Sequence, residues 1–282
     1  MSRSGILACG ALLLLPAIGS GTAPTALPAP SATGLSAAQI LEKNAAARGG
    51  LAAWHAVNTL SLSGKMEAGG NARSTLAMPV PGDHHPHAGM PTARPQEQTQ
   101  LPFVLQLKRP LSSRLEIQFQ GQTAVQVFDG SQGWKVRPFL NRHQVESFTP
   151  EELRTAASQA GIDGPLMDAA ARGITVSVAG KESVDGREAY KLTLTSKDKQ
   201  IQNVWVDAKS FLEVKMDGTP RRLDGRYHPV AVYLRNYKTV SGLVVPTLLE
   251  TAVQGVAGSE KIAIANVEVN PTLADARFSK PQ

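Results

Sequence analysis

Most of this chain, from residue 103 onward, is a succession of short segments in which apolar and polar residues alternate. Residues 114–120 read Arg-Leu-Glu-Ile-Gln-Phe-Gln, which places every second side chain on an apolar face. Asp-Gly pairs such as Asp129-Gly130 and Asp185-Gly186 separate successive segments and are typical of tight hairpins. The pattern predicts antiparallel strands joined by hairpins rather than parallel strands joined by helices.

The expected strands account for most of the chain after residue 58. They cover 59–66, 103–108, 114–120, 122–128, 133–137, 174–178, 189–195, 202–207, 211–216, 230–237, 245–253 and 261–269. So many antiparallel strands with only a few helices predict an α+β fold. Because successive strands are joined by hairpins, we expect one large curved antiparallel sheet in a single domain over residues 31–282.

Helical segments are expected near the N-terminus and in the middle of the series of strands. They cover 37–48, 51–57, 150–159 and 165–172. Ser36 is a good N-cap for the first of them. Thr149 as N-cap, followed by Pro150 at the first helical position, marks the start of the third. The two middle helices are rich in small residues and only weakly amphipathic.

The first thirty residues have the layout of a bacterial secretory signal. Arg3 precedes an apolar run at 6–18, and small residues and prolines continue to Pro30. The run is shorter than the roughly 20 apolar residues that a membrane span needs. We therefore expect a signal peptide over residues 1–30 and a periplasmic location for the mature chain.

Cys9 is the only cysteine, and it lies within that apolar run. A mature chain without Cys9 has no disulfide, no thiolate metal site and no cysteine nucleophile. The residues before Cys9 faintly resemble a lipoprotein processing box, so a lipid anchor on Cys9 is the less favoured alternative.

The net charge of +6 is scattered along the chain, without a basic run interleaved with aromatic residues. Nucleic acid is therefore not an expected partner.

Residues 67–100 interrupt the strand pattern with glycines, prolines and little apolar periodicity, which predicts a mobile insertion within a hairpin. This segment contains His84, His85 and His87, residues of a type that binds zinc, nickel or copper. Adjacent residues on an extended chain point in opposite directions, and no rigid element holds them together. We therefore expect at most adventitious metal binding there, and no cofactor.

Signs of catalysis are weak. The remaining histidines are His55, His143, expected in a turn after Arg142, and His228, expected at the start of a strand. The chain has no Gly-x-Ser-x-Gly elbow, no phosphate-binding glycine loop and no dinucleotide fingerprint. We expect a protein that is not an enzyme. A metal-dependent hydrolase stays open only if one of these histidines meets a carboxylate in a pocket.

The apolar positions of the strands are expected to form one continuous inner face, and those of the two middle helices to lie against it. The candidate residues of this face are Leu115, Ile117, Phe119, Val125, Val127, Trp134, Leu153, Leu166, Met167, Leu192, Leu194, Val204, Val206, Val232 and Leu234. Two short helices are too few to fill the concavity of so many strands. Either the sheet closes around a self-filled core, or it leaves an apolar pocket with the helices as a lid.

Several short motifs, in this order, carry a resemblance to a known group of proteins. They are Ala47-Arg48-Gly49-Gly50 with Trp54, Val127-Phe128-Asp129-Gly130 with Gly133-Trp134, Gly164-Pro165-Leu166, Val184-Asp185-Gly186-Arg187 with Ala189-Tyr190, the run from Tyr237 to Pro246, and Val269-Asn270 with Phe278-Ser279-Lys280-Pro281. With them the chain, over about residues 36–281, resembles the LolA/LolB-like superfamily, which includes proteins described as outer-membrane lipoprotein-sorting proteins.

The resemblance implies an unclosed antiparallel β-barrel whose helices plug an apolar cavity on the concave face. It implies a non-enzymatic periplasmic carrier or receptor that shelters acyl chains of lipoproteins or phospholipids, and the candidate residues above would then line the cavity. We expect a monomer with a possible protein partner in the cell envelope. The alternative is a non-enzymatic interaction module of the envelope whose core is filled.

The chain also departs from this group. The insertion at 67–100 is not part of the carrier pattern. In the carriers an arginine in the cavity helps to hold the lid, and Arg114 is the nearest candidate here. The alternation around Arg114 places its side chain opposite the apolar face, so that role is not carried over to it.

Overall fold

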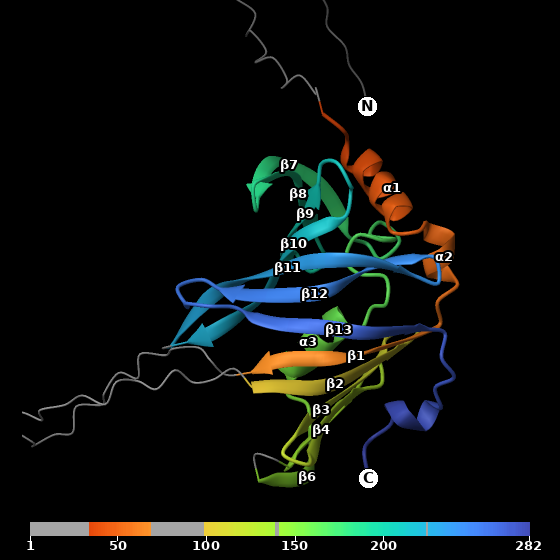
Figure 1. Cartoon of the computed structure of the whole chain (residues 1–282), viewed down its shortest axis with the longest axis vertical. Coiled ribbons are helices and arrows are strands. Elements are labelled where there is room, and N and C mark those ends of the chain that lie inside the picture. The colour runs from red at the N-terminus through yellow and green to blue at the C-terminus, as the bar shows by residue number, and fades with distance from the viewer. Residues whose placement is uncertain (1–33, 69–98, 139–140, 224) are drawn as a thin grey trace, which may run out of the picture. The chain divides into compact units, whose positions relative to one another are not determined.

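The strands in the described part of the chain form one antiparallel sheet (Figure 1). The computed structural model describes residues 34–68, 99–138, 141–223 and 225–282. The strands are β1 (Thr59–Ala68), β2 (Thr99–Lys108), β3 (Ser112–Phe119), β4 (Gln122–Phe128), β5 (Gly133–Arg137), β6 (Arg142–Ser147), β7 (Thr175–Val184), β8 (Arg187–Thr195), β9 (Ile201–Asp207), β10 (Glu213–Leu223), β11 (Arg226–Val240), β12 (Leu243–Val253) and β13 (Glu260–Val269).

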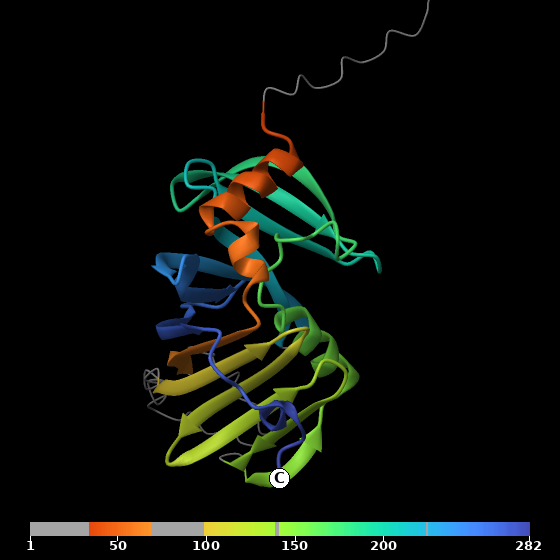
Figure 2. The ribbon, with the colours of Figure 1, turned by 90° about the vertical axis from the view of Figure 1, so that its right-hand side faces the viewer.

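The sheet is open at both ends. Its strand order is β6-β5-β4-β3-β2-β1-β13-β12-β11-β10-β9-β8-β7, so β6 and β7 are the edges. Strands that are adjacent in the sheet are also consecutive in the sequence, except for β1 and β13. The first and the last strand of the chain pair with each other in the middle of the sheet. Figure 2 shows the sheet curving around its inner side without closing. The expected α+β fold, with a curved antiparallel sheet forming an unclosed barrel, is confirmed.

The hairpin of β1 and β2 brackets the expected insertion. The two strands pair from Thr59 with Lys108 to Ala68 with Thr99, so the segment between them belongs to one hairpin connection. Residues 69–98 themselves, with His84, His85 and His87, lie outside the described residues. The expected signal peptide over residues 1–30, with Cys9, lies outside them too.

Cross-strand pairing defines which side chains share a face. Leu115 on β3 pairs with Leu105 on β2, Leu105 pairs with Leu62 on β1, and Leu62 pairs with Val267 on β13. On the other half of the sheet, Leu192 on β8 pairs with Val204 on β9, and Val204 with Met216 on β10. We call the face that carries these residues the inner face and the opposite one the outer face.

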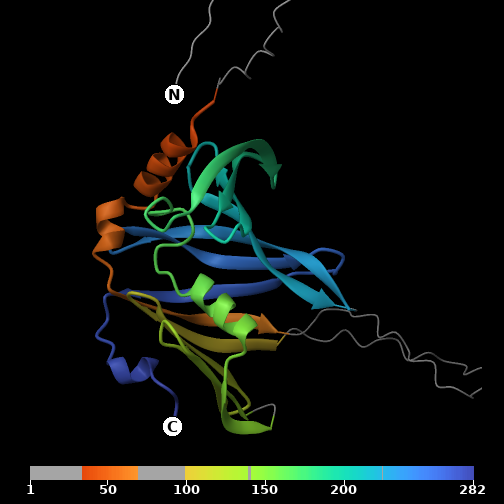
Figure 3. The same ribbon diagram turned by 180° about the vertical axis from the view of Figure 1, so that it is seen from behind.

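The helices and one long loop lie on the inner face (Figure 3). Helix α1 (Ala37–Ala47) begins with a capping box between Ser36 and Gln39, and its Ile40 packs with Leu192 and Val204. The short helix α2 (Leu51–His55) follows. Helix α3 (Pro150–Gln159) contacts β4 and β5, and the loop 161–173 leads from it to β7.

Two apolar clusters fill most of the inner face, and the loop 161–173 joins them. Met167 packs in one cluster with Trp54, Leu60 and Leu243. The preceding residue, Leu166, packs in the other cluster with Ile40 and Leu192. Two adjacent side chains of one loop therefore enter two different parts of the core.

The outer face is closed by different means in its two halves. The C-terminal turn η2 (Asp275–Phe278) lies against β3, with Phe278 buried and Arg277 bound to Gln106 and Glu116. Over β8–β11, Lys215 lies over the rings of both Trp205 and Tyr233. Aliphatic and cationic side chains thus cover aromatic rings that no helix shields.

Two expectations about local structure are wrong. Residues 165–172 do not form a helix but a series of turns, because Arg172 Nη2 binds the carbonyl oxygens of Gly164, Pro165 and Met167 and draws them together. His143 is not in a turn, since β6 begins at Arg142 and pairs with β5.

None of the helices in the described ranges is both long enough and apolar enough to cross a bilayer.

Candidate functional site

The inner face of the middle strands carries apolar side chains that the helices cover only in part. We call these residues the inner patch. They are half-buried and comprise Leu62, Leu105, Leu115, Ile117, Phe119, Val232, Leu234 and Leu249. Alternation along each strand and register between strands bring them to one side. By contrast, Leu192 and Val204 under α1 are completely buried.

Helix α3 lies on the inner side of the sheet and is held there loosely. Thr149 and Glu152 form a capping box, and Pro150 occupies the first turn, so the start of the helix is well defined. None of its residues is buried, although Leu153 and Ala156 are half-buried. Little apolar area therefore fixes α3 to the sheet.

One ion pair anchors the first turn of α3 to the sheet. Lys135 on β5 is buried on the inner face, and its Nζ binds both carboxylate oxygens of Glu152. Burial alone would raise the pKa of Glu152, but hydrogen bonds from Lys135 and from the Thr149 amide lower it overall. Glu152 thus caps its own helix and binds the sheet at the same time.

The loop 161–173 is fixed much more firmly than α3. Arg109, just after β2, donates from Nη1 to Asp163 Oδ2 at 2.8 Å and from Nη2 to Asp163 Oδ1 at 2.5 Å. Its remaining donors bind the carbonyl oxygens of Val57 and Trp54. Hydrogen bonding to Asp163 raises the pKa of Arg109, so the guanidinium stays charged. Such a two-pronged contact is among the stronger polar interactions in proteins.

Arg48 holds the same loop from the other side. It is buried at the end of α1, with its guanidinium 4.2 Å from the centre of the Trp54 ring. Its Nη1 donates to the carbonyl oxygen of Asp163 at 3.0 Å and to Glu213 Oε1 at 3.1 Å. The Tyr237 hydroxyl donates to the Glu213 carbonyl oxygen, and burial raises the pKa of this tyrosine. Arg48 therefore connects α1, β10 and the loop.

His55 is the histidine that meets a carboxylate. Its Nε2 lies 2.5 Å from Asp168 Oδ2, and this contact joins α2 to the loop 161–173. The His55 side chain is 51% exposed and that of Asp168 is 31% exposed. The geometry is that of a surface contact that steadies the loop.

The candidate residues predicted from sequence lie on both faces of the sheet. Those on the inner face, or packed against it, are Leu115, Ile117, Phe119, Leu153, Leu166, Met167, Leu192, Leu194, Val204, Val206, Val232 and Leu234. Val127 pairs with Arg114 and with Trp134, and Val125 pairs with Glu116. The prediction of one shared face is therefore wrong for Val125, Val127 and Trp134, which lie on the outer face.

Several residues of the site were not found from the sequence. Leu62 lies between Ser61 and Ser63 in an expected strand, so periodicity alone could have placed it, whereas Leu105 follows the apolar Val104 and is less clearly marked. Arg48, Arg109 and Asp163 are far apart in sequence, and nothing local indicates that they meet. Arg114, as expected, lies away from the apolar face and binds Glu116 and the carbonyl oxygen of Arg277.

Comparison with solved structures decides the fold. A LolA superfamily protein from Nitrosomonas europaea superposes with a TM-score of 0.53 at 17% identity, over 88% of this chain and 99% of that chain. A putative outer membrane lipoprotein-sorting protein domain from Vibrio parahaemolyticus gives a TM-score of 0.51 at 12% identity, over 86% and 95% of the two chains. The fold is LolA-like.

A third solved structure agrees, whereas sequence comparisons find nothing. A DUF1329 family protein from Desulfovibrio piger gives a TM-score of 0.53 at 12% identity, over 85% of this chain and 95% of that chain. No family model matches the sequence, and no curated protein matches it. At these identities the likeness concerns the fold alone.

Among the described residues, no group of three or more histidine, cysteine, aspartate or glutamate side chains is arranged to hold a metal ion.

Proposed function

We propose that this protein is a carrier or receptor that shelters acyl chains against the inner patch, beneath α3. The observation that carries the proposal is an apolar surface that is half-buried inside a curved sheet and bordered by a loosely packed helix. Each methylene group moved from water to such a surface contributes about 0.8 kcal/mol. A chain of ordinary fatty-acid length needs no charged contact to bind there.

The unequal attachment of α3 and the loop 161–173 supports a mechanism. Arg48 and Arg109 hold the loop from two sides through Asp163. Helix α3 depends on one ion pair between Lys135 and Glu152 and buries no residue completely. The loop then acts as a fixed wall, and α3 moves to admit and release the acyl chain, without covalent chemistry.

The cellular setting is part of the same proposal. Among the solved structures with this fold is a putative outer membrane lipoprotein-sorting protein domain from Vibrio parahaemolyticus. Together with the expected signal peptide at 1–30, this favours a periplasmic protein that exchanges acylated molecules within the cell envelope. We propose that it acts as a monomer, with acyl chains of lipoproteins or phospholipids as ligands.

The test measures acyl binding with an inner-face variant and a matched outer-face variant. Ile117→Asp introduces a charge into the inner patch, whereas Val125→Asp makes a similar change at a half-buried position on the outer face. Binding of a dansyl-labelled fatty acid to the delipidated protein should fall at least tenfold for the first variant and remain unchanged for the second. A folded Ile117→Asp protein that binds like the wild type contradicts the proposal.

An envelope interaction module is the second candidate, and one observation favours it. The edge strand β7 is ten residues long and mostly exposed, so its free backbone edge could add a strand from a partner. Native mass spectrometry of protein isolated without detergent separates the two functions. A bound lipid or acylated peptide supports the carrier, whereas a ligand-free protein that takes up no added fatty acid supports the module.

A further inference from the structure

A pocket on the outer face, which shares only Leu234 with the inner patch, has the composition of a ligand site. It has a volume of about 390 Å³. It lies beside the β7–β8 turn, the connection between β9 and β10, and the middle of β11. Its lining residues are Val184, Asp185, Arg187, Ser210, Leu212, Val214, Leu234, Arg235, Asn236 and Tyr237. The volume is within the range of small-molecule sites in proteins.

Four of the ten lining residues of the pocket are aliphatic, and the other six are polar or charged. Val184 and Val214 belong to a small cluster with Trp205 on the outer face, Leu212 adds a third aliphatic residue, and Leu234 borders both the pocket and the inner patch. These four branched side chains come from different elements. A volume of about 390 Å³ has room for a small ligand, so we expect the apolar part of a ligand to be short, branched or cyclic.

The charged residues at the rim of the pocket differ in how many hydrogen bonds and ion pairs their side chains form. The charge of Arg235 is balanced by two acids, because its Nη1 binds Asp185 Oδ2 at 2.6 Å and its Nε binds Glu250 Oε2 at 3.0 Å. Asp207, beside the pocket, accepts from the amides of Lys209 and Ser210. Arg187 is exposed and makes no hydrogen bond or ion pair with the described residues; it acts on Asp207 only through its charge.

We propose that this pocket binds a compact apolar carboxylate, with the guanidinium of Arg187 as the group that receives the carboxylate. Arginine matches a carboxylate with two parallel donors, and the exposed guanidinium has those donors available. The aliphatic walls take the rest of the ligand. Arg235, held by two acids, contributes shape and a fixed rim rather than net charge.

The inference is independent of the acyl carrier. Leu234 belongs to both the inner patch and the lining of the pocket, but Arg187, the residue proposed to receive the carboxylate, lies in the β7–β8 hairpin outside the inner patch. An acyl chain on the inner patch and a small acid held by Arg187 would therefore share only Leu234 among their contacts. Either site can exist without the other.

The experiment uses cyclohexanecarboxylate, with cyclohexylmethanol as a neutral probe of the same shape. Titration of the mature protein followed by amide resonances should shift residues 184–187, 210–214 and 235–237 with the acid. The alcohol should bind at least tenfold more weakly. Arg187→Gln should weaken the acid about tenfold or more, as expected for the loss of a charge-assisted hydrogen bond.

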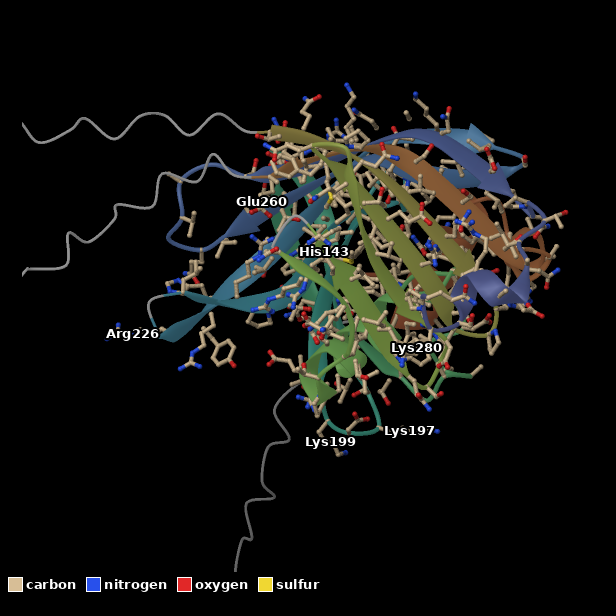
Figure 4. All side chains as sticks on the ribbon, turned by 90° about the horizontal axis from the view of Figure 1, so that it is seen from below. His143, Lys197, Lys199, Arg226, Glu260 and Lys280 are labelled. Carbon is tan, nitrogen blue, oxygen red and sulfur yellow. The ribbon has the colours of Figure 1, made fainter. Side chains whose placement is uncertain are left out.

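Two further variants make the result decisive. Arg226→Gln removes the same charge at the tip of the β10–β11 hairpin, where Figure 4 shows Arg226 far out on the molecule, and should leave the affinity unchanged. Ile117→Asp on the inner patch should also leave it unchanged. Equal binding of the acid and the alcohol, an unaltered affinity in Arg187→Gln, or shifts that map to the inner patch would each overturn the proposal.

Discussion

At the scale of the residue, the contact between Arg109 and Asp163 carries most of the attachment of the loop 161–173. Arg109→Ala removes two hydrogen bonds to a carboxylate whose side chain is only 17% exposed. It also removes a donor from the carbonyl oxygens of Val57 and Trp54, of which the second still accepts from the Val57 amide. We expect a loss of about 2–4 kcal/mol in the free energy of unfolding. Urea denaturation measures the loss, and hydrogen exchange should show it first in residues 161–173.

The control is an arginine of similar chemistry in a weak contact. Arg142 lies 3.7 Å from Glu146 and is exposed, so Arg142→Ala should cost less than about 0.5 kcal/mol. If Arg109→Ala is as mild as this control, the loop is held by its apolar residues rather than by its ion pair.

Gly49 is required for close approach as well as for its backbone conformation. Its φ is +104°, and an added Cβ would lie 2.1 Å from the Gly242 carbonyl oxygen. Gly130 has nearly the same φ, +105°, but open space around it. Gly130→Ala should therefore cost about 1–2 kcal/mol from backbone strain alone, and Gly49→Ala distinctly more. Thermal unfolding of both variants compares them, and equal shifts in melting temperature contradict the steric argument.

The number of residues in the β3–β4 turn explains why the prediction of one shared apolar face was partly wrong. The β3–β4 hairpin turns at Gln120 and Gly121, and Phe119 pairs with Gln122. A two-residue turn pairs odd positions with even ones, so Val125 and Val127 point away from Leu115. The sequence contained this information in the turn length. What it lacked was any indication that the outer face is buried there as well, beneath the C-terminal turn with Phe278.

At the scale of the element, helix α3 depends on a carboxylate that performs two tasks. Glu152→Gln keeps the helix-capping geometry but removes the charge that binds Lys135, whereas Glu151→Gln removes a neighbouring exposed charge from the same first turn. Glu152→Gln should lower the protection of α3 amides from hydrogen exchange by about 1 kcal/mol or more, and Glu151→Gln should not. Equal effects would mean that only the helix dipole matters.

The same helix should loosen in acid. The pKa of Glu152 in the folded protein is lowered from its usual value of 4.5. The stabilisation is therefore complete above about pH 4.5 and is lost as the pH falls through the lower folded-state pKa. Amide chemical shifts of α3, followed from pH 6 downward, should change below pH 4.5 in the wild type. In Glu152→Gln this change should be absent; its persistence would assign the transition to another group.

The loop 161–173 marks the limit of what local sequence determines. Residues 150–159 formed the predicted helix because its cap, proline and acidic first turn all agree. Residues 165–172 have a similar composition, but Asp168 has a φ of +51°, and Arg172 gathers three carbonyl oxygens that a helix would direct along its axis. Burial of this guanidinium lowers the pKa of Arg172. Tertiary contacts override the local preference of residues 165–172 for a helix, and no local sequence pattern predicts these contacts.

At the scale of the whole domain, one continuous sheet carries two separate apolar clusters, and the loop spans both. Met167 belongs to the cluster around Trp54 and Leu60, and Leu166 to the cluster around Ile40 and Leu192. Met167→Ala and Leu166→Ala should each cost about 2–5 kcal/mol, because both side chains are almost fully buried. Denaturant unfolding should remain a single transition, since backbone hydrogen bonds run without a break from β6 to β7.

The two variants should differ in where the domain opens. Hydrogen exchange should increase mainly in α2, β1 and β2 for Met167→Ala, and mainly in α1, β8 and β9 for Leu166→Ala. Because the altered residues are adjacent, a general effect on the loop would give the same pattern in both proteins. Distinct patterns mean that the loop joins two structural units with separate local stabilities, so that one part of the inner face can open for a ligand while the other stays folded.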